Sequence, residues 1–199
     1  MAQAFSNKHR MFWSRVAGVV LLAYVVLATP PRILPSWALE LGELLGLILL
    51  ATAAFGRIWC LVFVAGRKNN MVVAEGPYSV VRNPLYVFSF IGAVGFGLAV
   101  ENPLLALVLA SAFGLYYTFV VKGEEQFLAS QFGPAFQDYC ARTPRWLPNF
   151  RLYQQPETLT VSARKVGEGI LDAQWFIWAF VLSQLIEAAR SMGVLSQGS

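Results

Sequence analysis

The stretch of sequence that decides the fold covers residues 85–121 and reads LYVFSFIGAVGFGLAVENPLLALVLASAFGLYYTFVV. It contains two apolar runs, 85–100 and 104–121, on either side of a Glu101-Asn102-Pro103 turn. A helix that crosses a bilayer needs roughly 20 mainly apolar residues, with a range of about 17–25. The two runs therefore predict a pair of antiparallel helices that form a membrane hairpin.

Similar apolar runs occur on both sides of the hairpin. One covers 12–28, and another covers 37–65 with Arg57 inside it. The basic residues before 12–28 also fit a cleavable signal peptide, but no small-residue cleavage site follows the run, which favours a retained anchor. A further run at 173–189 is short and contains polar residues, so a spanning helix packed on the core or on a second subunit competes with a helix lying on the membrane surface.

The composition also indicates a membrane protein. Of the 199 residues, 57% are hydrophobic and 13% are charged, whereas soluble domains carry about 25% charged residues. The net charge of +4 is small and its charges are scattered, which excludes an ordinary nucleic-acid-binding protein. Two distant cysteines and one histidine exclude a disulfide framework, a multi-histidine metal site and a Ser-His-Asp triad. We therefore expect an all-α polytopic membrane bundle with four core transmembrane helices and a C-terminal fifth.

The distribution of basic residues predicts the orientation of this bundle. Because basic residues near helix ends concentrate on the cytoplasmic side, we expect the N-terminus, residues 66–84 and residues 122–172 to face the cytoplasm. The membrane would be the bacterial inner membrane or, in a eukaryote, the endoplasmic reticulum. In an alternating topology, 12 of the 15 basic residues fall on this side: Lys8, Arg10, Arg15, Arg67, Lys68, Arg82, Lys122, Arg142, Arg145, Arg151, Arg164 and Lys165.

The first cytoplasmic segment brings polar residues to the start of a helix. Pro84 keeps the preceding residue out of the α region and fits the first turn of a helix. Arg82, Asn83 and Tyr86 therefore cluster where the hairpin begins. The structural alternative is an Arg side chain that reaches the headgroups and a Tyr in the interfacial aromatic belt.

The second cytoplasmic segment begins with two adjacent carboxylates, Glu124 and Glu125, where the second hairpin helix leaves the bilayer. If that helix continues, Tyr117 shares a face with Glu124. The alternative is a solvated helix end near Lys122. Aromatic residues then recur at helical spacing, a pattern typical of packing or of an interfacial helix, at Phe132, Phe136 and Tyr139, followed by Cys140.

Taken together, the string GPYSVVRNPLY at 76–86, the hairpin, and EEQFLASQFGPAFQDYCARTPRWLP at 124–148 resemble the integral-membrane methyltransferases. This family includes isoprenylcysteine carboxyl methyltransferases and phospholipid N-methyltransferases. Its signature is a G-x-Y turn, an R-H-P-x-Y or N-P-x-Y element, a Glu-Glu pair and an F-G…Y…P…L-P tail. The resemblance covers residues 66–150, and the order and spacing of its elements make it more specific than any one motif.

The resemblance implies that S-adenosylmethionine binds in a pocket capped by the cytoplasmic segments, without a metal. A sulfonium attracts aromatic faces and carboxylates. We expect Glu125 or an acceptor-bound water to take a proton from an amine acceptor. We expect Arg57 to supply the positive charge that the acceptor site otherwise lacks, and the alternative is that its side chain reaches the lipid headgroups. The positions that match the family's cofactor site are Asn70, Met71, Val72, Val73, Tyr78, Asn83, Pro84, Leu85, Tyr86 and Glu124.

Two departures from the family pattern bear on the methyl acceptor. Carboxyl methyltransferases place an arginine one turn before the first Glu, where this chain has Val120, and a histidine where it has Asn83. Val cannot replace an Arg that holds a carboxylate. We therefore expect a lipophilic acceptor from the bilayer with an amine or phospholipid headgroup, rather than a prenylcysteine carboxylate.

Alternative functions are a carboxyl methyltransferase of the isoprenylcysteine type, a membrane reductase, and a non-catalytic membrane assembly protein on the same fold. The chain divides into N-terminal helices (1–65), a methyltransferase-like core (66–150) and a C-terminal extension (151–199). The helix of the extension is a candidate for contact with a second copy of the chain.

Overall fold

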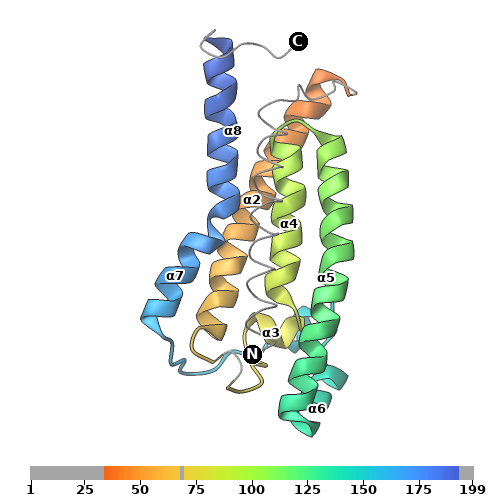
Figure 1. Ribbon diagram of the computed structural model, residues 1–199, viewed down its shortest axis with the longest axis vertical. Coiled ribbons are helices and arrows are strands. Elements are labelled where there is room, and N and C mark those ends of the chain that lie inside the picture. The colour runs from red at the N-terminus through yellow and green to blue at the C-terminus, as the bar shows by residue number, and fades with distance from the viewer. Residues whose placement is uncertain (1–33, 68–69, 193–199) are drawn as a thin grey trace. The chain divides into compact units, whose positions relative to one another are not determined.

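The computed structural model describes residues 34–67 and 70–192, and all regular secondary structure in this part of the chain is helical (Figure 1). The expected all-α class is confirmed for these residues, whereas the predicted helix at 12–28 lies outside them. Residues 34–177 form one compact unit, and α8 from Trp178 onward belongs to a second unit. In chain order the helices are α2 (Ser36–Val64), α3 (Pro77–Val80), α4 (Pro84–Ala99), α5 (Pro103–Phe132), α6 (Pro134–Arg142), the 3-10 helix η1 (Phe150–Leu152), α7 (Ala163–Ala173) and α8 (Trp175–Ser191).

Two of the described helices, α2 and α5, are long and apolar enough to cross a membrane, and α4 is a shorter apolar helix. Helices α2 and α4 match the predicted runs 37–65 and 85–100 to within one residue at each end. The predicted apolar run 104–121 forms the first part of α5, which continues as a helix beyond residue 121 to Phe132. At 1.5 Å per residue its 30 residues extend about 45 Å, more than the roughly 30 Å hydrocarbon core of a bilayer. Its last turns, including Glu124 and Glu125, therefore extend past the apolar part of the bundle.

Proline fixes where several of these helices begin. A proline in the first turn has the right φ angle and lacks an N–H that would have no partner there. At the hairpin turn, the side chain of Asn102 accepts a hydrogen bond from the Leu105 amide at 2.9 Å, which closes the predicted Glu101-Asn102-Pro103 turn. The helices that begin in this way are α3 at Pro77, α4 at Pro84, α5 at Pro103 and α6 at Pro134.

Helix α4 lies between α2 and α5 and packs against both (Figure 1). Glycines allow α2 and α4 to approach closely: a Cβ added at Gly46 would lie 2.7 Å from the carbonyl oxygen of Gly95. The arrangement brings the first turn of α4 between the last turn of α2 and the extended part of α5. These three helix ends frame the site.

The segments after α5 cover this end of the unit. Gly133, with φ of 53°, ends α5 and begins α6, which contacts α5. Helix α7 was not predicted and packs on α2, where Gly169 meets the Leu61 side chain. Helix α8 is found two residues later than the predicted run 173–189. Its passage through the membrane and its role in association stay predictions.

Candidate active site

A cavity lies where α2 and α5 end and α4 begins. Its wall is built from the end of α2, the loop that follows it, α3, the first turn of α4, the extended part of α5, and α6. Most of the site residues predicted from the sequence line it, although they come from four separate stretches of the chain: Met71, Val72, Val73, Tyr78, Asn83, Leu85, Tyr86, Glu124 and Glu125.

Three predicted site residues are not among the described residues that line the cavity. Arg57 donates from Nη1 to the hydroxyl of the buried Ser89, at the contact between α2 and α4. Asn70 is exposed, and its side-chain amide donates to the Gly66 carbonyl at 3.2 Å. Pro84 is fully buried as the first residue of α4. Arg57 therefore contributes to the contact between α2 and α4. Asn70 and Pro84 shape the backbone around the cavity.

The loop between α2 and α3 is held by an ion pair across its base. Arg67 donates to Oε2 of Glu75 from Nη1 at 3.0 Å and from Nη2 at 3.1 Å. Its Nε also lies 3.2 Å from the sulfur of Met71. These contacts hold Met71, with Val72 and Val73 after it, at the cavity wall.

Glu124 is bonded to an aromatic residue of α4. The hydroxyl of Tyr86 donates to Oε2 of Glu124 at 2.8 Å. The ring of Tyr86 in turn packs on the ring of Tyr117 with a centroid distance of 4.6 Å. Tyr117 therefore lies near Glu124, as the helical spacing predicts, and the contact passes through Tyr86. The result is a carboxylate bordered by aromatic rings.

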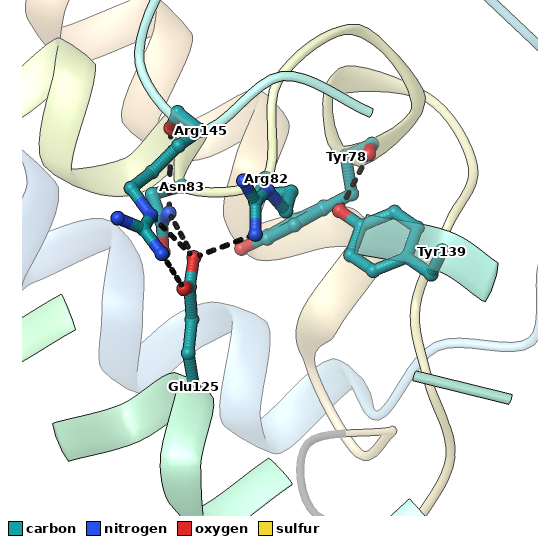
Figure 2. Close-up of polar contacts among 6 residues, drawn as sticks. All are labelled: Tyr78, Arg82, Asn83, Glu125, Tyr139 and Arg145. Atoms are coloured by element: carbon teal, nitrogen blue, oxygen red, sulfur yellow. Dashed lines mark hydrogen bonds and ion pairs between the residues drawn. The ribbon is translucent and has the colours of Figure 1, made fainter. Parts of the chain in front are cut away.

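Glu125 is held by two arginines (Figure 2). Arg145 donates to its two oxygens, from Nη2 to Oε2 at 2.7 Å and from Nε to Oε1 at 3.2 Å. Arg82 approaches Oε1 to 3.2 Å from Nη1, and the Asn83 amide lies 3.5 Å from the same oxygen. The Glu125 side chain is only 12% exposed. The hydrogen bond from Arg145 to Glu125 and the negative charge of Glu125 raise the pKa of Arg145, so the Arg145 guanidinium is always charged.

One donor of this cluster has no hydrogen-bond partner. The Nε of Arg82 is buried and unpaired within the described part of the chain. A buried N–H without an acceptor costs about 1–3 kcal/mol. Because Arg82 is a residue of the cavity wall, this N–H is a candidate to bind an anionic group of a ligand.

Tyr139 joins α6 to α3 beside the cavity (Figure 2). Its hydroxyl donates to the carbonyl oxygen of Tyr78 at 2.7 Å. Burial raises the pKa of both phenols well above the ordinary value of 10.0. Both side chains therefore stay neutral near pH 7, and Tyr139 stays a donor.

Sequence reasoning missed several residues of the site. The signal for Arg82 was present, because it precedes Asn83 in the motif. The aromatic spacing that predicts an interfacial helix also marks Phe136 and Tyr139, both buried on α6. Nothing in the local pattern pointed to Arg145, which reaches Glu125 only because the chain turns back after α6. The cavity-lining residues that were not predicted as cofactor or catalytic residues are Val64, Arg82, Leu128, Phe136 and Tyr139.

Comparison with known proteins identifies the family. A family described as phospholipid methyltransferase matches residues 45–135. The cobalt-zinc-cadmium resistance protein CzcN of Cupriavidus metallidurans is 37% identical over 191 residues, which are 96% of this chain and 88% of that protein. The nickel-cobalt-cadmium resistance protein NccN of Alcaligenes xylosoxydans xylosoxydans is 34% identical over 94% of this chain and 87% of its own length.

The isoprenylcysteine O-methyltransferases match a shorter part of this chain than the metal-resistance proteins do. Protein-S-isoprenylcysteine O-methyltransferase of Schizosaccharomyces pombe is 30% identical over 81 residues, which are 41% of this chain and 34% of that enzyme. No solved structure matches the chain. The chain belongs to the membrane methyltransferase family that includes phospholipid methyltransferases and isoprenylcysteine O-methyltransferases, and it resembles two metal-resistance proteins over most of their length.

Proposed function

We propose that this protein transfers a methyl group from S-adenosylmethionine to an amine or phospholipid headgroup of a lipophilic acceptor. The observation that carries the proposal is the cavity itself, where Tyr78, Tyr86 and Glu124 meet beside an apolar loop. Membership of the methyltransferase family supports the reaction class.

The chemistry of the cavity wall fits this cofactor. Aromatic rings and a carboxylate attract a sulfonium, and Tyr86 and Glu124 provide both in direct contact. The unpaired, buried N–H of Arg82 suits the carboxylate at the other end of the cofactor. Apolar side chains of Met71, Val72 and Val73 suit the nucleoside. These residues would hold the cofactor, and its chemistry requires no metal.

Bound S-adenosylmethionine would supply an electrophilic methyl group: the lone pair of the acceptor nitrogen would form the new N–C bond, and the electrons of the broken S–C bond would stay on sulfur as a neutral thioether. Glu124 favours the positively charged cofactor over its neutral product, because the sulfonium charge disappears in the reaction. Alignment of the acceptor by the cavity wall is the main contribution of the protein to the rate. We assign the proton released by the acceptor nitrogen to water, since both oxygens of Glu125 are held by Arg82 and Arg145.

An amine acceptor fits the charges around the cavity better than a carboxylate does. Position 120, one turn before Glu124, is a half-buried valine. Arg82 and Arg145, the guanidiniums close to Glu125, are both engaged with it. An acceptor carboxylate would therefore have to compete with Glu125 for these two guanidiniums, and with the cofactor carboxylate for the Nε of Arg82.

We propose that the cavity opens toward the cytoplasm. It lies at the end of the unit that also holds Arg67, Arg82, Arg142 and Arg145. Basic residues at helix ends favour the cytoplasmic side. A cysteine introduced beside the cavity, labelled by a membrane-impermeant reagent only in inside-out vesicles, tests this orientation.

The names of two relatives suggest a physiological setting. CzcN and NccN are named for resistance to divalent metals. We propose that this chain contributes to metal resistance through the lipid that it methylates. Wild-type protein, but not Glu124→Gln, should then restore growth in cobalt, zinc or cadmium to a strain that lacks the gene.

Titration of the purified protein in detergent with S-adenosylmethionine and with S-adenosylhomocysteine tests the cofactor site. Wild type should bind both, and Glu124→Gln should lose about tenfold more affinity for the charged cofactor than for the neutral product. Glu168→Gln, on the exposed surface of α7, is the matched control. Absence of binding at millimolar concentrations would contradict the cofactor, and an equal loss for both ligands would contradict the role of Glu124. Radiolabelled cofactor and native membrane lipids then identify the acceptor.

A further inference from the structure

The segment that follows α6 returns across α3 and pairs with it. We call residues 143–154 the connecting segment. Its main chain forms a series of hydrogen bonds with residues 76–82, which include all of α3 and the turn before α4. These bonds run from Arg82 N to Pro144 O (2.8 Å), from Asn149 N to Val80 O (3.0 Å), from Gly76 N to Gln154 O (2.7 Å) and from Gln154 N to the Ser79 hydroxyl (2.9 Å).

Side chains add a second attachment at one end of the connecting segment. Arg145, near its start, pairs with Glu125 of α5, which also holds Arg82 (Figure 2). The Asn83 side chain donates to the Arg145 carbonyl at 3.3 Å. We call Arg82, Glu125 and Arg145 the ion cluster. It joins α5, the turn before α4 and the connecting segment at one point of the cavity wall.

The two ends of the connecting segment are held differently. The far end bonds to Ser79 and Val80, which are 4% and 3% exposed, through the main chain of Asn149 and Gln154. The near end depends on an ion pair whose Arg145 side chain is 40% exposed. Because Arg145 is partly exposed, salt screens this pair more than a fully buried one, while the 12% exposure of Glu125 keeps the contact strong enough to hold the near end. Separation of the connecting segment from the cavity wall should therefore begin at Arg145.

We propose that Arg145 is a positioning residue that holds the connecting segment to the cavity wall through Glu125, and that breaking this contact sets the rate at which the cofactor leaves. The proposal rests on the methyltransferase function for its second half. Arg82, Asn83 and Glu125 all line the cavity, so the same contact that holds the connecting segment also fixes these three side chains. Release of Arg145 would loosen them together.

Amide hydrogen exchange in the ligand-free, full-length protein tests the attachment without any cofactor. Arg145→Ala should speed exchange in the peptide that contains the Arg82 amide, which donates to Pro144 beside the substitution. The peptide with the Gly76 amide, bonded to the far end, should keep its rate. Arg164→Ala breaks an exposed Arg–Glu pair on α7 and is the matched control that should change neither. Unchanged exchange at Arg82 in Arg145→Ala would overturn the proposal.

The dissociation rate of radiolabelled S-adenosylmethionine tests the second half of the proposal, that breaking the Arg145–Glu125 contact sets the rate at which the cofactor leaves. Arg145→Ala should release the cofactor about tenfold faster, and Arg145→Lys, which keeps the charge but not the two-point contact, should fall between it and wild type. A purely structural role for Arg145 would lower the amount of folded protein but leave the dissociation rate of the folded fraction at the wild-type value, which would overturn this half. If wild type binds no cofactor, the proposed function fails, while the exchange of the Arg82 amide still decides the attachment.

Discussion

The hydroxyl of Tyr86, in the first turn of α4, donates a hydrogen bond to Oε2 of Glu124 at 2.8 Å. The two residues are 38 positions apart and belong to the two helices of the membrane hairpin. Glu124 reaches this contact because α5 continues as a helix beyond its apolar stretch to Phe132. The bond leaves a charged oxygen and an aromatic ring on the same side of one cavity.

Tyr86→Phe should weaken cofactor binding without loss of fold. The substitution removes the hydrogen bond that orients Glu124 but keeps the ring, and a hydrogen bond to a charged group contributes about 1.5–3 kcal/mol. We expect about a tenfold rise in the dissociation constant for S-adenosylmethionine, measured by calorimetric titration. Tyr116→Phe removes a hydroxyl from a half-exposed ring on α5 and should leave the constant unchanged. Equal effects of the two substitutions would contradict the role of Tyr86.

Val120→Arg should change the choice of acceptor. The new guanidinium would lie one helical turn before Glu124, where it would repel an amine and attract a carboxylate. We expect the ratio of carboxyl to amine methylation to rise at least about tenfold when a prenylcysteine analogue and native lipids compete for radiolabelled cofactor. Phe119→Arg adds the same charge on the exposed face at a similar depth and serves as the control. An unchanged ratio in Val120→Arg would argue against an acceptor site beside this residue.

Gly46→Ala should separate α2 from α4. The added Cβ would lie 2.7 Å from the Gly95 carbonyl oxygen, and neither backbone can yield without moving its helix. Overpacking of this kind costs about 1–3 kcal/mol, so we expect a lower melting temperature in detergent. Gly42→Ala, one turn earlier in α2, meets nothing within 4 Å and should be neutral or stabilising because alanine favours helices. A melting temperature for Gly46→Ala equal to that of Gly42→Ala would show that the close contact is dispensable.

The membrane helices could be predicted because hydropathy and proline act locally. The apolar runs are visible in the sequence itself, and Pro84 and Pro103 mark the first residues of α4 and α5. Hydropathy alone leaves the end of α5 open, because it falls at residue 122 while Glu, Gln, Leu and Ala continue the helix to Phe132. The motif residues of the site were found because they are contiguous in short stretches.

The ion cluster and α7 could not be predicted in the same way. Arg145 reaches Glu125 only after Gly133 has turned the chain into α6, and no periodicity links the two positions. Helix α7 is short, and it is polar apart from the face that contacts α2 near Gly169. Its sequence pattern is therefore typical of a polar linker. Arg57 was predicted to supply a charge to the acceptor because a charge in an apolar run needs a partner, and its hydrogen bond to Ser89 on α4 could not be foreseen from the sequence. These features depend on contacts between distant segments.

Ionisation of the buried phenols should destabilise the protein at alkaline pH. Burial raises the pKa of Tyr78 and Tyr139 in the folded state above the ordinary value of 10.0. Above pH 10 the unfolded chain therefore loses protons that the folded protein retains, and the free energy of unfolding falls as pH rises, by up to about 1.4 kcal/mol per pH unit for each group. Tyr139→Phe should cost about 1 kcal/mol at pH 8, because the Tyr78 carbonyl loses its donor, yet it should reduce the alkaline slope because phenylalanine cannot ionise. Thermal unfolding between pH 8 and pH 12 in one detergent measures both effects. Tyr153→Phe, which replaces a tyrosine that is 42% exposed, is the control. If it reduced the pH dependence of stability as much as Tyr139→Phe does, the assignment to burial would be contradicted.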